Sequence, residues 1–236
     1  MEQRLIPIED YVTIVEITVK IKKGKAETLQ MRQNFLKNKT MKGIIASGSA
    51  ETKREIVKAG THIATCYSMI HIGTVEWEYQ GEKKWSNKVK LTFELPNEMR
   101  DFGGEQKPMV ISKEYTISLH EKSNLRKDLE SWKGASLTAD DLRGFDITQL
   151  LSKPAMLSII HKTSKGGNEF AQIGNVSAPM NGMEIPEQIN ETFIFNYEDN
   201  FNQEWLDKQP QWIQEQIKAS SEYQTKMVEP VNDMPF

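Results

Sequence analysis

Residues 84–95 read Lys-Trp-Ser-Asn-Lys-Val-Lys-Leu-Thr-Phe-Glu-Leu. From Val89 onward apolar residues alternate with polar or charged ones, the pattern of a β-strand with one face in a core and the other in solvent. Residues 61–75 are also β-rich, and Tyr79-Gln80-Gly81-Glu82-Lys83 between the two segments has the composition of a turn. The two segments therefore predict a β-hairpin.

The chain beyond this hairpin predicts another strand, a helical stretch and a second hairpin. Residues 109–119 have strand character, Ser123 is placed to cap a helix that ends near Trp132, and Thr138 opens a second short helix. Residues 155–162 and 170–178 then flank a glycine-bearing turn. We expect a mainly β fold with helical additions, namely a five-stranded OB-type barrel with a helical insertion between strands 3 and 4.

Segments on either side of the barrel have a different character. Residues 11–22 predict a strand and residues 26–37 a short helix, whereas the C-terminal part predicts helices broken at Pro210. The sequence thus divides into four parts: an N-terminal extension without assigned function (1–58), the barrel (59–180), a helical extension (181–225) and a flexible tail (226–236).

Composition narrows the classes of function. The 236 residues carry a net charge of −3, one cysteine and four histidines, so an internal disulfide is excluded and we expect no metal and no cofactor. The sequence has neither an apolar run of the ~20 residues that a membrane helix needs nor the apolar core of a signal peptide, so we expect a cytoplasmic protein without membrane contact. Because no phosphate loop or nucleophile motif occurs, we also expect no enzymatic activity.

The distribution of charge is uneven along the chain. Residues 1–60 carry twelve Lys and Arg against seven Asp and Glu, whereas residues 186–236 carry three against ten. Residues 80–170 are nearly balanced, at fifteen against thirteen. A basic-to-balanced body with an acidic C-terminal region is compatible with a polyanionic ligand.

Basic and aromatic residues alternate within the predicted barrel. Single-stranded nucleic acids require cations for the phosphates and aromatic faces on which unpaired bases stack. The candidate DNA-binding residues are Lys84, Trp85, Lys88, Lys90, Lys113, Tyr115, Lys122, Arg126, Lys127, Lys162, Lys165 and Phe170.

Several of these residues also fit a purely structural role. Trp85 shares the strand face of Val89, which suits packing at the barrel rim as well as base stacking, and Tyr115 is favoured as a core residue. For Lys88, Lys90, Arg126 and Lys127, a solvated surface and a DNA contact remain equal alternatives.

The last four residues suggest a partner-binding tail. Asp233, Met234, Pro235 and Phe236 place an aromatic ring beside a carboxylate, a combination that suits an apolar pocket rimmed by Arg or Lys. A tail without function is the alternative, and the sequence by itself does not separate the two.

Several stretches resemble a family of phage and prophage proteins regarded as single-stranded DNA-binding replication proteins. They are Ala59-Gly60-Thr61-His62-Ile63-Ala64, Met69-Ile70-His71-Ile72-Gly73-Thr74, Leu119-His120-Glu121-Lys122-Ser123-Asn124-Leu125-Arg126, Leu129-Glu130-Ser131-Trp132-Lys133-Gly134, Gly144-Phe145-Asp146-Ile147 and Leu150-Leu151-Ser152-Lys153-Pro154. The resemblance spans about residues 59–180. In addition, the terminal Asp-Met-Pro-Phe is similar to the Asp-Ile-Pro-Phe tip of bacterial single-stranded DNA-binding proteins, with Met234 in place of the usual Ile.

The resemblance implies a sequence-tolerant single-stranded DNA-binding protein of a phage-like replication or recombination system. Its partners would be single-stranded DNA and, through the tail, replication or recombination proteins, with self-association left open. Two other classes of function are the alternatives. One is a non-catalytic β-barrel phage structural or protein-interaction protein, and the other is a nuclease or recombination accessory protein that would require Mg²⁺.

Overall fold

The computed structural model describes residues 55–228, which belong to one compact unit. The strand and helix expected at 11–22 and 26–37 lie outside the described residues, as do the tail residues Asp233, Met234, Pro235 and Phe236. Within the described part, no helix has both the length and the apolar character needed to cross a bilayer.

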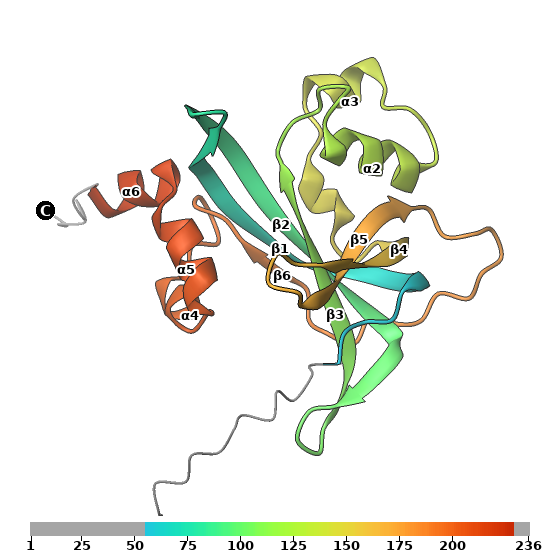
Figure 1. The fold of residues 1–236 in the computed structure, drawn as a ribbon. Helices are drawn as coiled ribbons and strands as arrows, with labels where there is room; N and C mark the ends of the chain where they lie inside the picture. Colours follow the sequence, from blue (N-terminus) through green and yellow to red (C-terminus); the bar gives the residue numbers. More distant parts are fainter. Residues whose placement is uncertain (1–54, 229–236) are drawn as a thin grey trace, which may run out of the picture. The chain divides into compact units, whose positions relative to one another are not determined.

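Six strands form one sheet (Figure 1). The order β3-β2-β1-β4-β5 is antiparallel throughout, and β6 pairs in parallel with the middle of β1. The strands are β1 Gly60–Tyr79, β2 Glu82–Asp101, β3 Gln106–Thr116, β4 Pro154–Thr163, β5 Glu169–Ser177 and β6 Phe193–Phe195. The expectation of a mainly β fold with helical additions is confirmed.

The helical insertion lies between β3 and β4, as predicted. It consists of α2 Asn124–Lys133, α3 Ala139–Arg143 and the short 3₁₀ helix η1 Ile147–Leu150. The Ser123 side chain accepts a hydrogen bond from the Arg126 amide, and Thr138 forms a reciprocal capping box with Asp141. The Leu125 and Leu129 side chains of α2 are buried in the same core as the strand residues. This helix therefore packs on the main core of the sheet.

The expected five-stranded closed barrel is corrected in two respects. The sheet has a sixth strand, and no backbone ladder joins β3 to β5 in the part of the chain that the structure describes. Instead α2 packs against both strands, and Lys113 Nζ reaches the Gly174 carbonyl at 3.5 Å across the seam. A register shift near Gly174 interrupts the pairing of β5 with β4. The sheet is curved but not closed: β3 and β5 approach each other without a backbone ladder in the described residues, and α2 packs across both of them.

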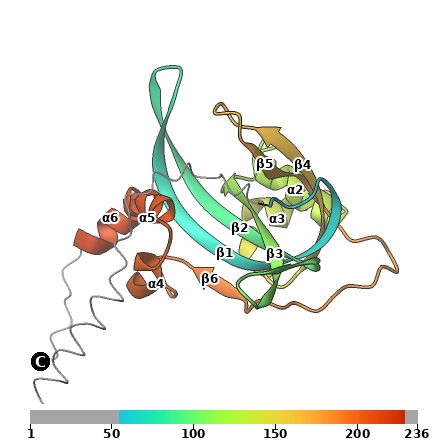
Figure 2. The same cartoon turned by 60° about the horizontal axis from the view of Figure 1, so that its bottom comes forward.

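The long strand β1 curves strongly (Figure 2). Its pairing with β2 shifts register at Tyr67 and again at Ile72, so that each residue is extra relative to β2. Such bulges bend a strand and increase its twist. At the far end, Gln80 and Gly81 both have positive φ, as a two-residue type I′ turn requires. The turn predicted there is confirmed.

A second hydrophobic cluster joins residues 189–228, the C-terminal segment, to β1. It lies on the outer face of β1, which is the face away from the main core. Phe195, Leu206 and Ile217 are fully buried there against Ile70 and Ile72. The helices of this segment are α4 Gln203–Asp207, α5 Gln211–Lys218 and α6 Ser221–Val228. The predicted break at Pro210 separates the first two. Together with β6, these helices form a cover over part of the outer face of the sheet.

The second bulge of β1 is also an anchoring point. The Tyr197 hydroxyl donates to the Ile72 carbonyl at 2.6 Å, and the Glu222 carboxylate accepts from the Thr74 amide at 2.6 Å. Gly73 between them has no room for a side chain, since an added Cβ would lie 2.6 Å from Glu222 Oε2. The C-terminal segment thus satisfies backbone groups that would otherwise be left open on an edge strand.

Candidate nucleic-acid interface

Residues 75–86 form the far end of the β1–β2 hairpin, which we call the arm. In Figure 2 it stands away from the rest of the ribbon. Three aromatic side chains on it are exposed: Trp77, Tyr79 and Trp85, the last with 59% of its surface accessible. Exposed tryptophans are unusual on a surface without a ligand, because burying a ring of this size is strongly favourable. The arm is therefore the first candidate for a stacking surface.

The rings lie on both faces of the arm. Trp85 is opposite Glu76 in the ladder and shares the face of the core residue Val89, whereas Trp77 is opposite Lys84 on the other face. On that second face Lys84 Nζ lies 4.8 Å above the Tyr79 ring. The Trp77 indole N–H donates to Ser86 Oγ at 2.7 Å, which fixes its orientation. Trp85 is therefore not packed in the core, and base stacking on it stays a prediction.

The β4–β5 hairpin carries the second exposed group. Phe170 is 41% exposed and is the ladder partner of Lys162, and Lys165 lies in the turn beyond them. Neither lysine has a carboxylate within ion-pair distance among residues 55–228. In Figure 2 the tips of this hairpin and of the arm point to the same side of the sheet. The hairpin therefore offers an aromatic ring with two uncommitted cations.

Lys122 and Lys127 are exposed cations near the start of α2. Lys122 lines a cavity of about 480 Å³ between the end of β3 and α2, together with His120 and Lys88. Lys88 is already paired there with Glu114 at 2.7 Å. This cavity is therefore mixed in charge, and only Lys122 contributes a cation without a partner in the described structure.

Lys113 and Tyr115, two of the predicted DNA-binding residues, belong to a buried network. Lys113 Nζ donates to Asp128 Oδ2 at 2.6 Å, and the Tyr115 hydroxyl donates to the same oxygen at 2.7 Å. Burial first, and then the charge of Asp128, raise the pKa of Tyr115. The network attaches α2 to β3, so neither side chain presents a free group to a ligand. The core position favoured for Tyr115 is thus observed.

Lys84 and Arg126 also have partners within the chain. Lys84 lies 3.9 Å from Glu82, and Arg126 Nε donates to Glu130 at 3.0 Å. Arg126 makes a second hydrogen bond to the Leu119 carbonyl. The Arg126 guanidinium is half-buried and fixed in place, which favours a structural role for it.

The outer face of β2 is covered where Lys90 was expected to meet solvent. Lys90 Nζ lies 3.9 Å above the centre of the Trp212 ring, and burial lowers the pKa of this lysine despite the nearby charge of Glu114. On the next turn of α5, Gln216 donates to Glu114 on β3 at 3.4 Å. The C-terminal segment therefore occupies the part of the outer face that the sequence assigned to DNA.

Trp77 and Tyr79 were missed as candidates. Val75, Trp77 and Tyr79 alternate with Glu76 and Glu78, which is the pattern of a continuing strand. Ending the strand at Val75 concealed this pattern. The signal was present, since a strand that leads into a tight turn commonly continues to it.

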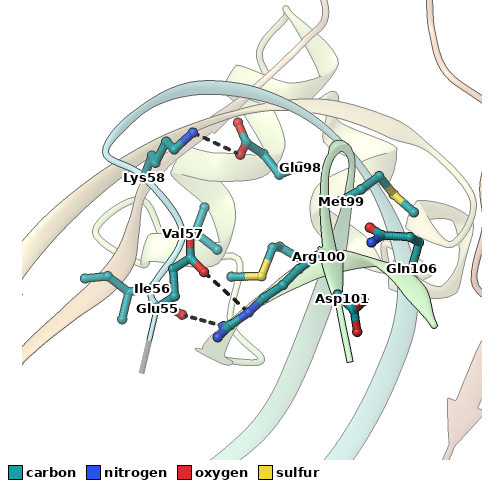
Figure 3. A pocket seen from close by; sticks show the side chains of 10 residues that line it. Glu55, Ile56, Val57, Lys58, Glu98, Met99, Arg100, Asp101 and Gln106 are labelled. Atoms are coloured by element: carbon teal, nitrogen blue, oxygen red, sulfur yellow. Dashed lines mark hydrogen bonds and ion pairs between the residues drawn. The ribbon is translucent and has the colours of Figure 1, made fainter. Parts of the chain in front are cut away.

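A second cavity, of about 420 Å³, lies where residues 55–58 cross the end of the β2–β3 hairpin (Figure 3). Arg100 Nε lies 3.5 Å from Glu55, and Lys58 Nζ lies 4.0 Å from Glu98. Its charges are thus largely paired with one another. Across residues 55–228, no group of three His, Cys, Asp or Glu side chains is placed to hold a metal ion.

No family model matches the chain, and no curated protein matches it.

Proposed function

We propose that the protein binds single-stranded DNA without strong sequence preference, by stacking bases on exposed rings and placing lysines along the phosphates. The observation that carries the proposal is the exposure of Trp85 on the arm, together with Phe170, Lys162 and Lys165 on the second hairpin. Both hairpins combine rings with cations, the pairing of groups that single strands require.

The strand order supports an OB-like assignment for this sheet. In the OB-fold, strand 1 pairs with strands 2 and 4, and the loops between strands 1–2 and 4–5 contribute to oligonucleotide binding. Here β1 pairs with β2 and β4, and the rings lie on the β1–β2 and β4–β5 hairpins. We therefore propose an open OB-like barrel in which these two hairpins bind the single-stranded DNA.

Because the C-terminal segment covers part of the outer face, only some of the predicted residues are available to contact single-stranded DNA. Because Lys90 lies beneath Trp212 and Lys113 is paired with Asp128, neither is available for phosphate. Trp85 is on the uncovered face of the arm, and Lys162 and Lys165 have no carboxylate within ion-pair distance in the described part of the chain. The proposed contacts are therefore fewer than the sequence indicated.

The wider role follows the family resemblance of residues 59–180. In this proposal the protein catalyses no reaction and acts as a DNA-binding protein in a phage-like replication or recombination system. The terminal residues Asp233, Met234, Pro235 and Phe236 would recruit replication or recombination enzymes. Removal of these four residues should then abolish partner recruitment without changing affinity for oligo-dT.

The direct test is a titration of tryptophan fluorescence with oligo-dT. Stacking is worth about 1–3 kcal/mol per base, so Trp85→Ala should weaken binding about 5- to 150-fold. Phe102→Ala is the matched control, because Phe102 is equally exposed but lies on the β2–β3 turn. Equal affinity of wild type and Trp85→Ala would contradict the assignment of the arm.

A salt titration tests the cations separately. Each phosphate contact contributes about 0.7 to the slope of log affinity against log salt for a single strand. Lys162→Gln combined with Lys165→Gln should therefore lower that slope by about 1.4. Lys208→Gln is the control, since Lys208 is paired with Glu204 on α4. If wild type does not bind oligo-dT at low salt, the proposed function is wrong.

A further inference from the structure

Both edges of the arm have no partner strand within residues 55–228. Along β1, pairing with β4 and β6 ends at Ile70, and the contacts of Tyr197 and Glu222 end at Thr74. Along β2, pairing with β3 ends at Lys88, and one further hydrogen bond reaches the Asn87 carbonyl. From Val75 and from Ser86 outward, each strand therefore has one open row of backbone donors and acceptors.

The two open edges carry opposite charge. The β1 edge, residues 75–79, contains Glu76 and Glu78 and no cation. The β2 edge, residues 82–86, contains Lys83 and Lys84 and one carboxylate, Glu82. An acidic edge on one copy is thus complementary to a basic edge on another.

The pairing of these two segments is already observed once in each chain. Within the arm they form an antiparallel ladder, with Glu78 opposite Lys83 and an ion pair of 2.8 Å between Glu76 and Lys83. A β1 edge placed beside the β2 edge of a second copy could adopt the same residue register through the outward backbone groups that the arm leaves open, which brings Glu76 and Glu78 beside Lys83 of that copy. The order of strands would then continue β2-β1-β2-β1 from copy to copy, antiparallel throughout.

We propose that the arm is a self-association element, in which the acidic β1 edge of one copy pairs with the basic β2 edge of the next. Because the two surfaces differ, the contact is head-to-tail and continues in one direction. The pairing uses the strand edges and leaves both faces of each arm free. The rings of successive copies would then form a continuous row on each face of the extended sheet.

The short, charged edges make this contact weak between free molecules. Each offers five residues, and ion pairs at an exposed site contribute at most about 1 kcal/mol. Copies bound to one strand would be held close together, which raises their effective concentration. The inference does not depend on DNA binding, since association of free protein tests it alone.

The test is the weight-average mass of the full chain in sedimentation equilibrium over a range of concentrations. Wild type should rise from the monomer mass of 27.1 kDa to at least twice that value. Glu76→Lys with Glu78→Lys makes both edges basic, and Lys83→Glu with Lys84→Glu makes both acidic. Each double variant should remain monomeric.

Two rescues distinguish edge pairing from unfolding of the arm. An equimolar mixture of the two double variants restores complementary edges between copies and should associate. The variant with all four reversals restores complementarity within and between arms and should associate like wild type. Glu204→Lys with Lys208→Glu, an exposed pair on α4, is the control that should not change the mass.

The outcome is separable from that of the proposed function. Wild type that stays monomeric up to about 100 µM, or a double variant that associates like wild type, overturns the inference. The limit is set at about 100 µM because a weaker contact would act only at the mM effective concentrations of linked molecules. A strand of about 12 nucleotides, within the site size of one barrel, measures DNA binding separately. Association without oligo-dT binding would support the inference and remove the proposed function.

Discussion

Removal of the Asp128 carboxylate should destabilise the protein strongly, because two buried donors depend on it. Lys113 Nζ and the Tyr115 hydroxyl both donate to Asp128 Oδ2, and the side chains of Lys113 and Asp128 are only 16% and 10% exposed. Loss of one partner from a buried ion pair costs about 3–5 kcal/mol, and some solvent reaches this pair. We therefore expect Asp128→Ala to lower the free energy of unfolding by about 3 kcal/mol.

The measurement is urea unfolding followed by circular dichroism, with the free energy extrapolated to zero denaturant. Asp140→Ala is the matched control: Asp140 is paired with Arg143, but both side chains are more than four-fifths exposed. It should cost less than about 0.5 kcal/mol, as exposed pairs do. A loss below about 1 kcal/mol for Asp128→Ala would refute the argument that burial makes this network essential.

The same network decides between two roles for Lys113. If the role is structural, Lys113→Met should lower stability, and its effect should not add to that of Asp128→Ala, with a coupling of about 1–2 kcal/mol. Affinity for oligo-dT should be unchanged in the folded protein. A lower affinity and an unchanged stability would restore Lys113 to the DNA-binding residues.

Three further predictions concern the C-terminal segment. Gly73→Ala should cost about 2 kcal/mol in urea unfolding, because φ is positive and the new Cβ would meet Glu222, whereas Gly144→Ala, with nothing within 4 Å, should not. Partial burial raises the pKa of Glu222, but two hydrogen bonds from Thr74, the Glu222 amide and the nearby His71 together hold the pKa below the ordinary value. The stability that they contribute is therefore complete above the ordinary carboxyl pKa and is lost as the pH falls through the lowered one. Hydrogen-exchange protection factors of the α6 amides can follow this loss, and protection factors that stay constant over this range would contradict it. Glu94→Gln should cost about 2 kcal/mol in thermal or urea unfolding, since the fully buried Glu94 carboxylate accepts three N–H groups from residues 189–190 and an amide would direct a donor at one of them.

Local pattern predicted the elements of the fold but not how the sheet ends. The alternation after Val89 and the turn residues Gln80 and Gly81 act over a few neighbours, so the β1–β2 hairpin could be found from the sequence alone. The three-residue strand β6 is too short for any period, and its partner lies more than 120 residues away. Whether β3 and β5 form a ladder likewise depends on residues about 60 positions apart, which no local pattern contains.

Only part of the candidate site could be predicted, because long-range packing decides which of its side chains are covered. The exposure of Trp85 follows from where the core ends: it shares a face with Val89, but the core does not extend as far as the arm. The odd or even position of a residue along a strand shows on which face its side chain lies. It does not show whether the core extends far enough to cover that side chain. Lys90 illustrates the opposite case, because its position on the outer face was correct and the covering Trp212 comes from a helix far along the chain.

The two bulges of β1 connect the curvature of the sheet with the position of the arm. The bulge at Ile72 turns the strand just beyond the end of its pairing with β6, and Tyr197 and Glu222 bind the Ile72 carbonyl and the Thr74 amide there. The base of the arm is thus held by the C-terminal segment immediately before its free part begins at Val75. A hairpin of two strands is marginally stable by itself in water, so we expect this anchor to stabilise the base of the arm. Loss of the anchor should therefore affect the arm before the main core, and the arm is the element on which both the proposed binding and the proposed self-association depend.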